Sequence, residues 1–210
     1  MVFISGVKYC EYLAVDTACG LVHRHLRQGN ECTYGYRVLF TKLAASGYIP
    51  LAVVSDGGTG IYSTLRYFAV TIQQRCHVHL LRDLKVGLRM PTRRMRNNLR
   101  KWYITRYAKL LLGAQDKEQE RLRRRHFERV VLKMWPPQGD GEKNTIKAFI
   151  RSLAKAQTYL NYPHFSIPTT TNIVEGYISH VRARLKTLRG LKSPANAELL
   201  LNAIHVSLVR

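Results

Sequence analysis

Residues 50–85 read PLAVVSDGGTGIYSTLRYFAVTIQQRCHVHLLRDLK, and this stretch decides the fold class. An apolar run, Leu51–Val54, is rich in β-branched residues and stops at Ser55–Gly58. A helical pattern follows, then a second β-type run over 70–75, and a new helix begins at Cys76. The order strand, turn, helix, strand, helix is typical of a parallel sheet.

Asp56 stands where the first of these two strands ends. In parallel sheets, chemistry gathers where the carboxyl ends of strands meet loops. The two glycines that follow Asp56 let the backbone turn tightly and leave the carboxylate unshielded. The alternative is a plain turn in which Asp56 caps the next helix, because Asp is a preferred N-cap residue.

The same patterns assign elements on both sides of this stretch. Three short strands, at 2–4, 12–15 and 21–26, are separated by glycine turns, which predicts antiparallel hairpins. Apolar residues at helical spacing predict a helix over 31–47. Near the end, Thr169–Asn172 supplies N-cap residues for a helix that carries Glu175, and a last amphipathic helix covers 194–208. An α/β protein is therefore expected.

Charge is the most unusual feature of the composition. The chain has 210 residues, enough for one domain or one domain with an insertion, and a formal net charge of +21 from 34 Lys and Arg against 13 Asp and Glu. So strong a positive field favours a polyanionic partner, most commonly nucleic acid. No segment approaches the roughly 20 apolar residues that a membrane span requires, so no membrane partner is expected.

The four cysteines have no regular spacing, which favours reduced thiols in a cytosolic protein. A zinc site built from Cys10, Cys19, Cys76 and His79 is a weak alternative, because the paired ligand spacing of zinc sites is missing.

Residues 90–160 contain no β-type run but are rich in basic residues. Their first part combines cations for phosphates with aromatic rings that could stack on exposed bases, namely Trp102, Tyr103 and Tyr107. The alternative is that these are solvated helix faces. The residues expected to contact DNA are Arg93, Arg94, Arg96, Arg100 and Lys101 here, and Arg182, Arg184 and Lys186 in the helix after Glu175.

Three motifs occur in a fixed order along the chain: SDGGTGIYSTL at 55–65, QQRCHVHLLRDLK at 73–85 and PTTTNIVEGYISHVRARLKTLRGL at 168–191. Together they resemble the catalytic domain of Mutator-type insertion-sequence transposases of bacteria. The resemblance implies a ribonuclease-H-like mixed sheet with an all-helical insertion before the final catalytic helix. In those terms, 1–89 is the first part of the core, 90–165 is the basic helical insertion and 166–210 completes the core.

The resemblance also implies DD(E) chemistry, in which Mg²⁺ or Mn²⁺ supports DNA cleavage and strand transfer. Asp56 and Glu175 match the family's second catalytic Asp and its catalytic Glu, which hold the metal. Cys76 and His79 match a Cys-x-x-His element near the active site. Carboxylates suit this chemistry, because two divalent cations need hard oxygen ligands to hold the attacking and leaving oxygens.

The chain departs from the family pattern at the first strand. Ser5-Gly6 stands where the family has its first Asp followed by Gly, and a hydroxyl is a poor substitute for a carboxylate on Mg²⁺. Asp16, at the end of the next strand, is the candidate third metal ligand. The missing Asp, and the lack of the family's N-terminal DNA-binding region, suggest an N-terminally truncated or decayed copy, or a domain fragment.

The partners that the resemblance implies are the transposon ends and the target DNA. A homo-oligomer is expected when the protein is bound to DNA, in the cytoplasm and associated with the nucleoid. Two other functions remain open: a non-catalytic DNA-binding remnant of a transposase, and a basic RNA-binding protein.

Overall fold

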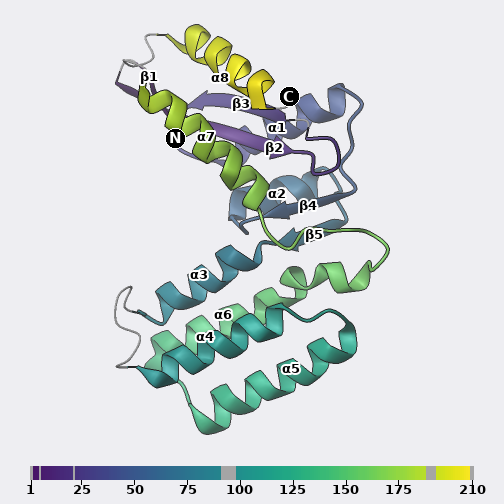
Figure 1. Cartoon of the computed structure of the whole chain (residues 1–210), viewed down its shortest axis with the longest axis vertical. Helices are drawn as coiled ribbons and strands as arrows, with labels where there is room; N and C mark the ends of the chain where they lie inside the picture. The colour runs from purple at the N-terminus through teal and green to yellow at the C-terminus, as the bar shows by residue number, and fades with distance from the viewer. Residues whose placement is uncertain (1, 5, 21, 91–97, 188–192, 209–210) are drawn as a thin grey trace. The chain divides into compact units, whose positions relative to one another are not determined.

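The computed structural model describes residues 2–4, 6–20, 22–90, 98–187 and 193–208. The chain divides into two compact units. The first consists of Met1–Leu51, Gly58–Thr71 and Thr171–Arg210, and the second of Ala52–Gly57 and Ile72–Thr170. Each unit combines a small sheet with helices (Figure 1), which confirms the α/β class.

The sheet of the first unit is an antiparallel meander. It contains β1 (Val2–Ile4), β2 (Val7–Val15) and β3 (Val22–Gln28), in the order β1-β2-β3. The three predicted hairpin strands are confirmed, but β2 is longer than the expected 12–15. The sequence pattern missed its first half, which backbone pairing holds in the sheet without an apolar pattern. Residues 7–9 pair with β1, and residues 9–11 pair with β3.

One face of this sheet packs against α1 (Thr33–Ala45), on which α2 (Thr59–Tyr67) lies. Tyr12 of β2 is buried on that face, and its hydroxyl oxygen accepts a hydrogen bond of 2.8 Å from the Cys32 N–H at the start of α1. A Cβ added to Gly35 would lie 2.0 Å from the Tyr12 ring. The absence of a side chain at Gly35 therefore lets α1 approach the sheet this closely.

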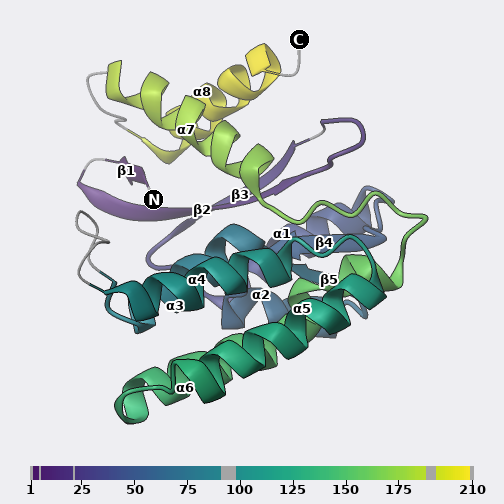
Figure 2. The same cartoon turned by 60° about the horizontal axis from the view of Figure 1, so that its bottom comes forward.

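The opposite face packs against α7 (Asn172–Thr187) and α8 (Pro194–Leu208). Figure 2 shows the sheet between α1 and this helix pair. Leu13 and Val22 contact a cluster of buried side chains from the two helices: Tyr177, Val181, Leu201 and Ile204. Arg24 of β3 also holds α8, because its guanidinium donates hydrogen bonds of 2.6 Å to the Asn202 side chain and to the Glu198 carbonyl oxygen.

The second unit contains a two-stranded sheet and a helical layer. Strands β4 (Ala52–Ser55) and β5 (Ile72–Arg75) pair in parallel, with Ser55 opposite Arg75, which confirms the predicted parallel pair. Its described residues contain four α-helices: α3 (His77–Gly87), α4 (Leu99–Leu112), α5 (Lys117–Arg129) and α6 (Gly139–Ala156). They also contain two short helical segments, η2 (Val130–Met134) and η3 (Thr158–Asn161).

The helices of the second unit lie side by side (Figure 1), and they share one hydrophobic core. Its fully buried members come from all four α-helices and include Leu84, Ile104, Leu111, Phe127, Phe149 and Leu153. The described part of residues 90–165 is helical and contains no strand, as the sequence predicted. Because the described strands form two separate sheets, the single mixed sheet of a ribonuclease-H-like fold stays a prediction.

Candidate functional site

The carboxyl edge of the β4–β5 sheet carries three of the predicted site residues. Asp56 follows β4 directly and is exposed, and Cys76 follows β5 directly and is fully buried. The Cys76 N–H donates a 2.7 Å hydrogen bond to the Ser55 carbonyl oxygen, which ties the two strand ends together. The structure thus brings Asp56 and Cys76 to the same edge. His79 lies in the first turn of α3, which begins right after Cys76.

Arg75 shapes this edge, although the sequence did not single it out. Its guanidinium donates to the Asp83 carboxylate at 2.7 Å and to the Ser152 hydroxyl at 2.5 Å. It also lies against Gly57, where a Cβ would be 2.6 Å from the arginine Nε. The side chain of Arg75 therefore packs against the turn that contains Asp56 and Gly57. Its position beside Cys76 was visible in the sequence, but its partners, eight and 77 positions away, were not.

Gly57→Ala should destabilise the second unit by about 1–3 kcal/mol, because two penalties combine at this position. Its φ of +95° lies in the left-handed region, and the new methyl group would collide with an arginine that Asp83 and Ser152 hold in place. Urea unfolding followed by tryptophan fluorescence measures the loss, since both tryptophans, Trp102 and Trp135, belong to this unit.

Gly139→Ala is the matched control for that experiment. Gly139 also has a positive φ, of +78°, but a Cβ there would meet nothing within 4 Å. The control measures backbone strain without the collision. Equal losses of stability in the two variants would show that Arg75 yields easily and does not fix the Asp56 turn.

Asp16 is engaged in the turn between β2 and β3. One carboxylate oxygen accepts hydrogen bonds from the N–H groups of Ala18 at 2.7 Å and Cys19 at 3.4 Å, and the other accepts one of 2.6 Å from the Tyr48 hydroxyl. The bond from Tyr48, followed by that from Ala18, lowers the pKa of Asp16. These contacts favour a structural role in the turn, and metal binding by Asp16 stays a prediction. Ser5 lies outside the described residues.

Glu175 lies in the first turn of α7, and its side chain is exposed. Its carboxylate accepts a 3.0 Å hydrogen bond from the Thr171 hydroxyl. Glu175 belongs to the first unit and Asp56 to the second, so the convergence of the two carboxylates stays a prediction. Among the described residues, no group of three or more His, Cys, Asp or Glu side chains forms a metal-binding cluster, and the four cysteines are free thiols.

Residues 25–208 match the family model described as transposase, Mutator family. The chain belongs to the Mutator family of transposases. The matched range of this Mutator-family chain includes Asp56, Cys76, His79 and Glu175 but neither Ser5 nor Asp16. A search of curated proteins found no match.

Two of the expected DNA-binding residues of this Mutator-family transposase are engaged within the protein. Arg100 is only 9% exposed, and its guanidinium binds the Glu142 carboxylate and the Pro136 carbonyl oxygen. Lys101 lies 3.5 Å from the same carboxylate. Burial opposes ionisation of Glu142, but the bond from Arg100, the bond from the Gln138 N–H and both cations outweigh it and lower its pKa. These contacts favour a structural role for Arg100 and Lys101.

The other expected DNA contacts divide into two groups. Arg182 and Arg184 are exposed on α7 of the first unit. Arg93, Arg94 and Arg96 lie outside the described residues, as does the side chain of Lys186. DNA binding by each of these residues stays a prediction.

The exposed cations of α5 form a stripe along the helix. Lys117, Arg121, Arg125 and Arg129 are all exposed and recur every fourth residue, so they share one face of the helix. Arg124, in contrast, pairs with Glu120 at 3.6 Å and with Glu128 at 3.3 Å. The four cations of the stripe therefore carry charge that no ion pair among the described residues neutralises.

The aromatic residues expected to meet bases contact other aromatic rings of the protein. The Tyr103 ring lies nearly parallel to those of Trp135 and Tyr107, at centroid distances of 6.0 and 6.4 Å. Arg106 lies 5.0 Å above the Trp102 ring. None of the described helices combines the length and the apolar character that crossing a membrane demands.

Proposed function

We propose that this chain is a DD(E)-type transposase domain that cuts transposon-end DNA and joins it to a target by metal-dependent phosphoryl transfer. The observation that carries the proposal is the match to the Mutator transposase family over residues 25–208, which span both acidic motifs. A ribonuclease-H-like core, interrupted by a helical insertion over 90–165, is part of the same proposal.

Asp56 and Glu175 are the proposed metal ligands. Both side chains are exposed, and both offer the hard carboxylate oxygens that Mg²⁺ and Mn²⁺ prefer. The turn that Arg75 supports presents Asp56 at the edge of its sheet, and α7 presents Glu175 from its first turn. When bound, the metal ions would stabilise the charge that develops on the attacking and leaving oxygens. DNA as substrate agrees with the net charge of +21.

The second candidate function is a DNA-binding remnant without catalysis. It is favoured by Ser5, which stands where the family has its first Asp. Two carboxylates would then be left to hold the metal, and two divalent cations brought together need more anionic ligands than that.

Titration of Mn²⁺ into the protein, followed by calorimetry, separates these candidates. Asp56→Asn should weaken Mn²⁺ binding by about 10- to 100-fold or more, because it removes an anionic ligand. Ser5→Asp should strengthen binding by supplying the missing carboxylate, whereas Ser5→Ala should change little. Metal-dependent cleavage of DNA by the same variants then shows whether stronger metal binding restores chemistry.

Asp16→Asn is the variant that tests the competing ligand. If Asp16 holds metal, the unmodified protein should already cleave DNA, and Asp16→Asn, unlike the two Ser5 variants, should abolish both cleavage and Mn²⁺ binding. Unchanged Mn²⁺ affinity in Asp56→Asn would contradict the proposed metal site altogether.

A further inference from the structure

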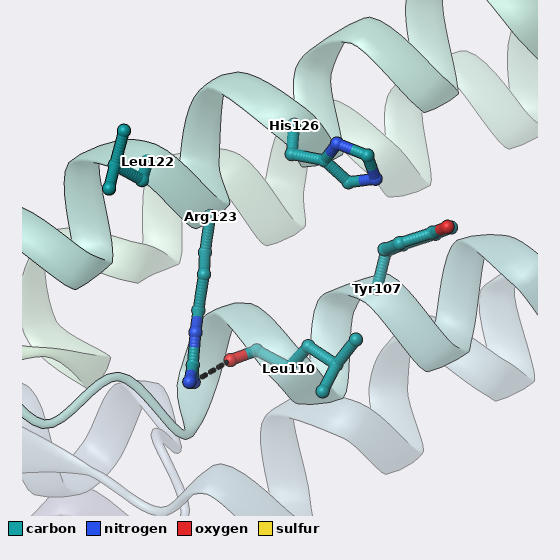
Figure 3. A pocket seen from close by; sticks show the side chains of 5 residues that line it. All are labelled: Tyr107, Leu110, Leu122, Arg123 and His126. Atoms are coloured by element: carbon teal, nitrogen blue, oxygen red, sulfur yellow. Dashed lines mark hydrogen bonds between the residues drawn. The ribbon is translucent and has the colours of Figure 1, made fainter.

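A notch lies between α4 and α5 of the second unit, away from Asp56 and Glu175 in the sequence. It encloses about 240 Å³, and its lining residues are Tyr107 and Leu110 from α4 and Leu122, Arg123 and His126 from α5. Figure 3 shows the α4 and α5 side chains facing each other across the gap. Its volume falls below the roughly 300–1,000 Å³ of pockets for drug-sized ligands, so it suits a single small group.

The walls of the notch are apolar and aromatic. Two large hydrophobic residues that line the notch are exposed to solvent: Leu110 of α4 at 46% and Leu122 of α5 at 58%. The rings of Tyr107 and His126 lie 4.7 Å apart and tilted by 56°. Tyr107 in turn continues the row of nearly parallel rings formed with Tyr103 and Trp135. A flat aromatic group entering the notch would therefore meet the rings of Tyr107 and His126 and two leucine side chains.

Arg123 closes one end of the notch. Its guanidinium crosses from α5 and donates a 2.7 Å hydrogen bond to the Leu110 carbonyl oxygen near the end of α4 (Figure 3). The bond satisfies a carbonyl group that the helix end leaves without a helical partner. It also ties α5 to α4 beside the notch, which lies where these two helices pack together.

Exposed cations flank the notch on both helices. Arg106 lies one turn from Tyr103 and one turn from Leu110, on the same face of α4. On α5, Arg125 and Arg129 share a face with Leu122 and His126, at three- and four-residue spacings. The acidic residues of α5 nearest this face are Glu118, which precedes Leu122 by one turn, and Glu128, which pairs with Arg124.

We propose that this notch binds an unpaired base of single-stranded DNA, with the adjoining phosphates on Arg106, Arg125 and Arg129. A nucleotide is a flat aromatic group joined to an anion, and the notch offers an aromatic and apolar slot beside a cationic rim. Base stacking on aromatic side chains, combined with a basic track for the backbone, is the physical basis of single-strand binding. The inference rests on the proposed function, because it takes DNA as the partner of the chain.

The experiment compares three probes at equal length: an oligothymidylate, the same backbone with abasic positions, and a blunt duplex. Binding is measured with the full chain in buffer free of divalent metal, by anisotropy of the labelled DNA and by tryptophan fluorescence. Stacking of one base should make the oligothymidylate bind roughly 5- to 150-fold more tightly than the abasic strand. It should also change the emission of Trp102 and Trp135, the two tryptophans of the chain.

Three variants of the notch test its walls. Tyr107→Ala should remove most of the preference for the strand with bases, and His126→Ala and Leu122→Ser should reduce it. Leu122 and His126 are exposed, so substitutions there should not prevent folding. These two variants therefore test the notch even if Tyr107→Ala fails to fold. Leu199→Ser is the matched control, because Leu199 is also a largely exposed leucine, at 67% against 58% for Leu122, and lies on α8 of the first unit. It should leave the preference unchanged.

The outcomes separate this inference from the proposed function. Equal affinity for the strands with and without bases, in a protein that still binds DNA, would overturn the notch inference alone. Failure to bind any nucleic acid would overturn both. Tighter binding of an oligouridylate would reassign the notch to RNA. Self-association that Leu122→Ser abolishes, with an unchanged preference for bases, would reassign it to a second copy of the chain.

Discussion

Raising the salt concentration from about 50 to 200 mM should lower the affinity of this protein for duplex DNA by roughly a thousand-fold or more. The reason is counterion release: each phosphate that a Lys or Arg neutralises frees a condensed cation, and added salt opposes that release. A chain with a net charge of +21 and an exposed basic stripe on α5 can make several such contacts. Fluorescence polarisation of a labelled duplex over a salt series gives the binding constant at each salt concentration. The slope of its logarithm against the logarithm of the salt concentration measures the number of neutralised phosphates.

Two variants of α5 locate the phosphate-binding residues behind that slope. Arg125→Gln combined with Arg129→Gln should reduce its magnitude by about 0.9 for each phosphate that the protein no longer neutralises. Arg124→Gln is the matched control, because Arg124 lies on the same helix but pairs with Glu120 and Glu128. An affinity that stays flat over this salt range would contradict electrostatic binding, and an equal effect in the control would place the bound phosphates away from the stripe.

Arg100→Met should destabilise the second unit by about 3 kcal/mol, which would mark Arg100 as a structural residue. The side chains of Arg100 and Glu142 are only 10% and 13% exposed, and removal of the arginine leaves a carboxylate in this buried position. Lys101 remains 3.5 Å from that carboxylate, so the loss should fall at the lower end of the roughly 3–5 kcal/mol seen when a buried pair is broken. Urea unfolding followed by tryptophan fluorescence measures it.

Arg100→Met combined with Glu142→Met supplies the companion measurement. An apolar pair of similar volume often replaces a buried ion pair without loss, so the double variant should recover most of the stability. Arg121→Met, on the exposed face of α5, should cost almost nothing. If Arg100→Met instead weakens DNA binding and leaves stability unchanged, Arg100 contacts DNA as the sequence suggested.

The local part of the fold was predictable from the sequence. The expected strands that begin at 51 and 70, the helical pattern between them and the helix expected from Cys76 appear as β4, β5, α2 and α3, and each stated start is shifted by one or two residues. These elements carry their own signals: β-branched runs, glycine stops and helical spacing. The position of Asp56 at a strand end follows from the same signals.

The parts that sequence could not predict depend on distant partners. Arg100 was predicted to contact DNA because its partner, Glu142, lies 42 positions later in the chain. No local sequence pattern indicates that the two residues pair. From the sequence, Tyr103 and Tyr107 were expected to offer their rings to bases. In the folded helices, Trp135 lies against Tyr103 and His126 against Tyr107, and no local pattern indicates these contacts. Arg75 was overlooked because its role depends on contact with Gly57 and on a bond to Ser152 of α6.

The segmented make-up of the first unit determines when it can be completed during synthesis. Its strands β1–β3 belong to the beginning of the chain, but the helices that cover one face of them, α7 and α8, belong to its end. Arg24 bonds to Asn202, 178 positions later. The second unit closes with residue 170, so it can fold while the first still waits for its last segment.

On the ribosome, the face of the meander that contains Leu13 and Val22 therefore stays uncovered until the last forty residues have emerged. An exposed apolar sheet face favours aggregation. We therefore expect chaperones to bind the nascent chain until α7 and α8 pack on this face. Glu175 is carried by one of these late helices. The proposed catalytic carboxylate is thus synthesised late, as part of α7. A chain interrupted before α7 would retain the basic helical unit but would lack this carboxylate.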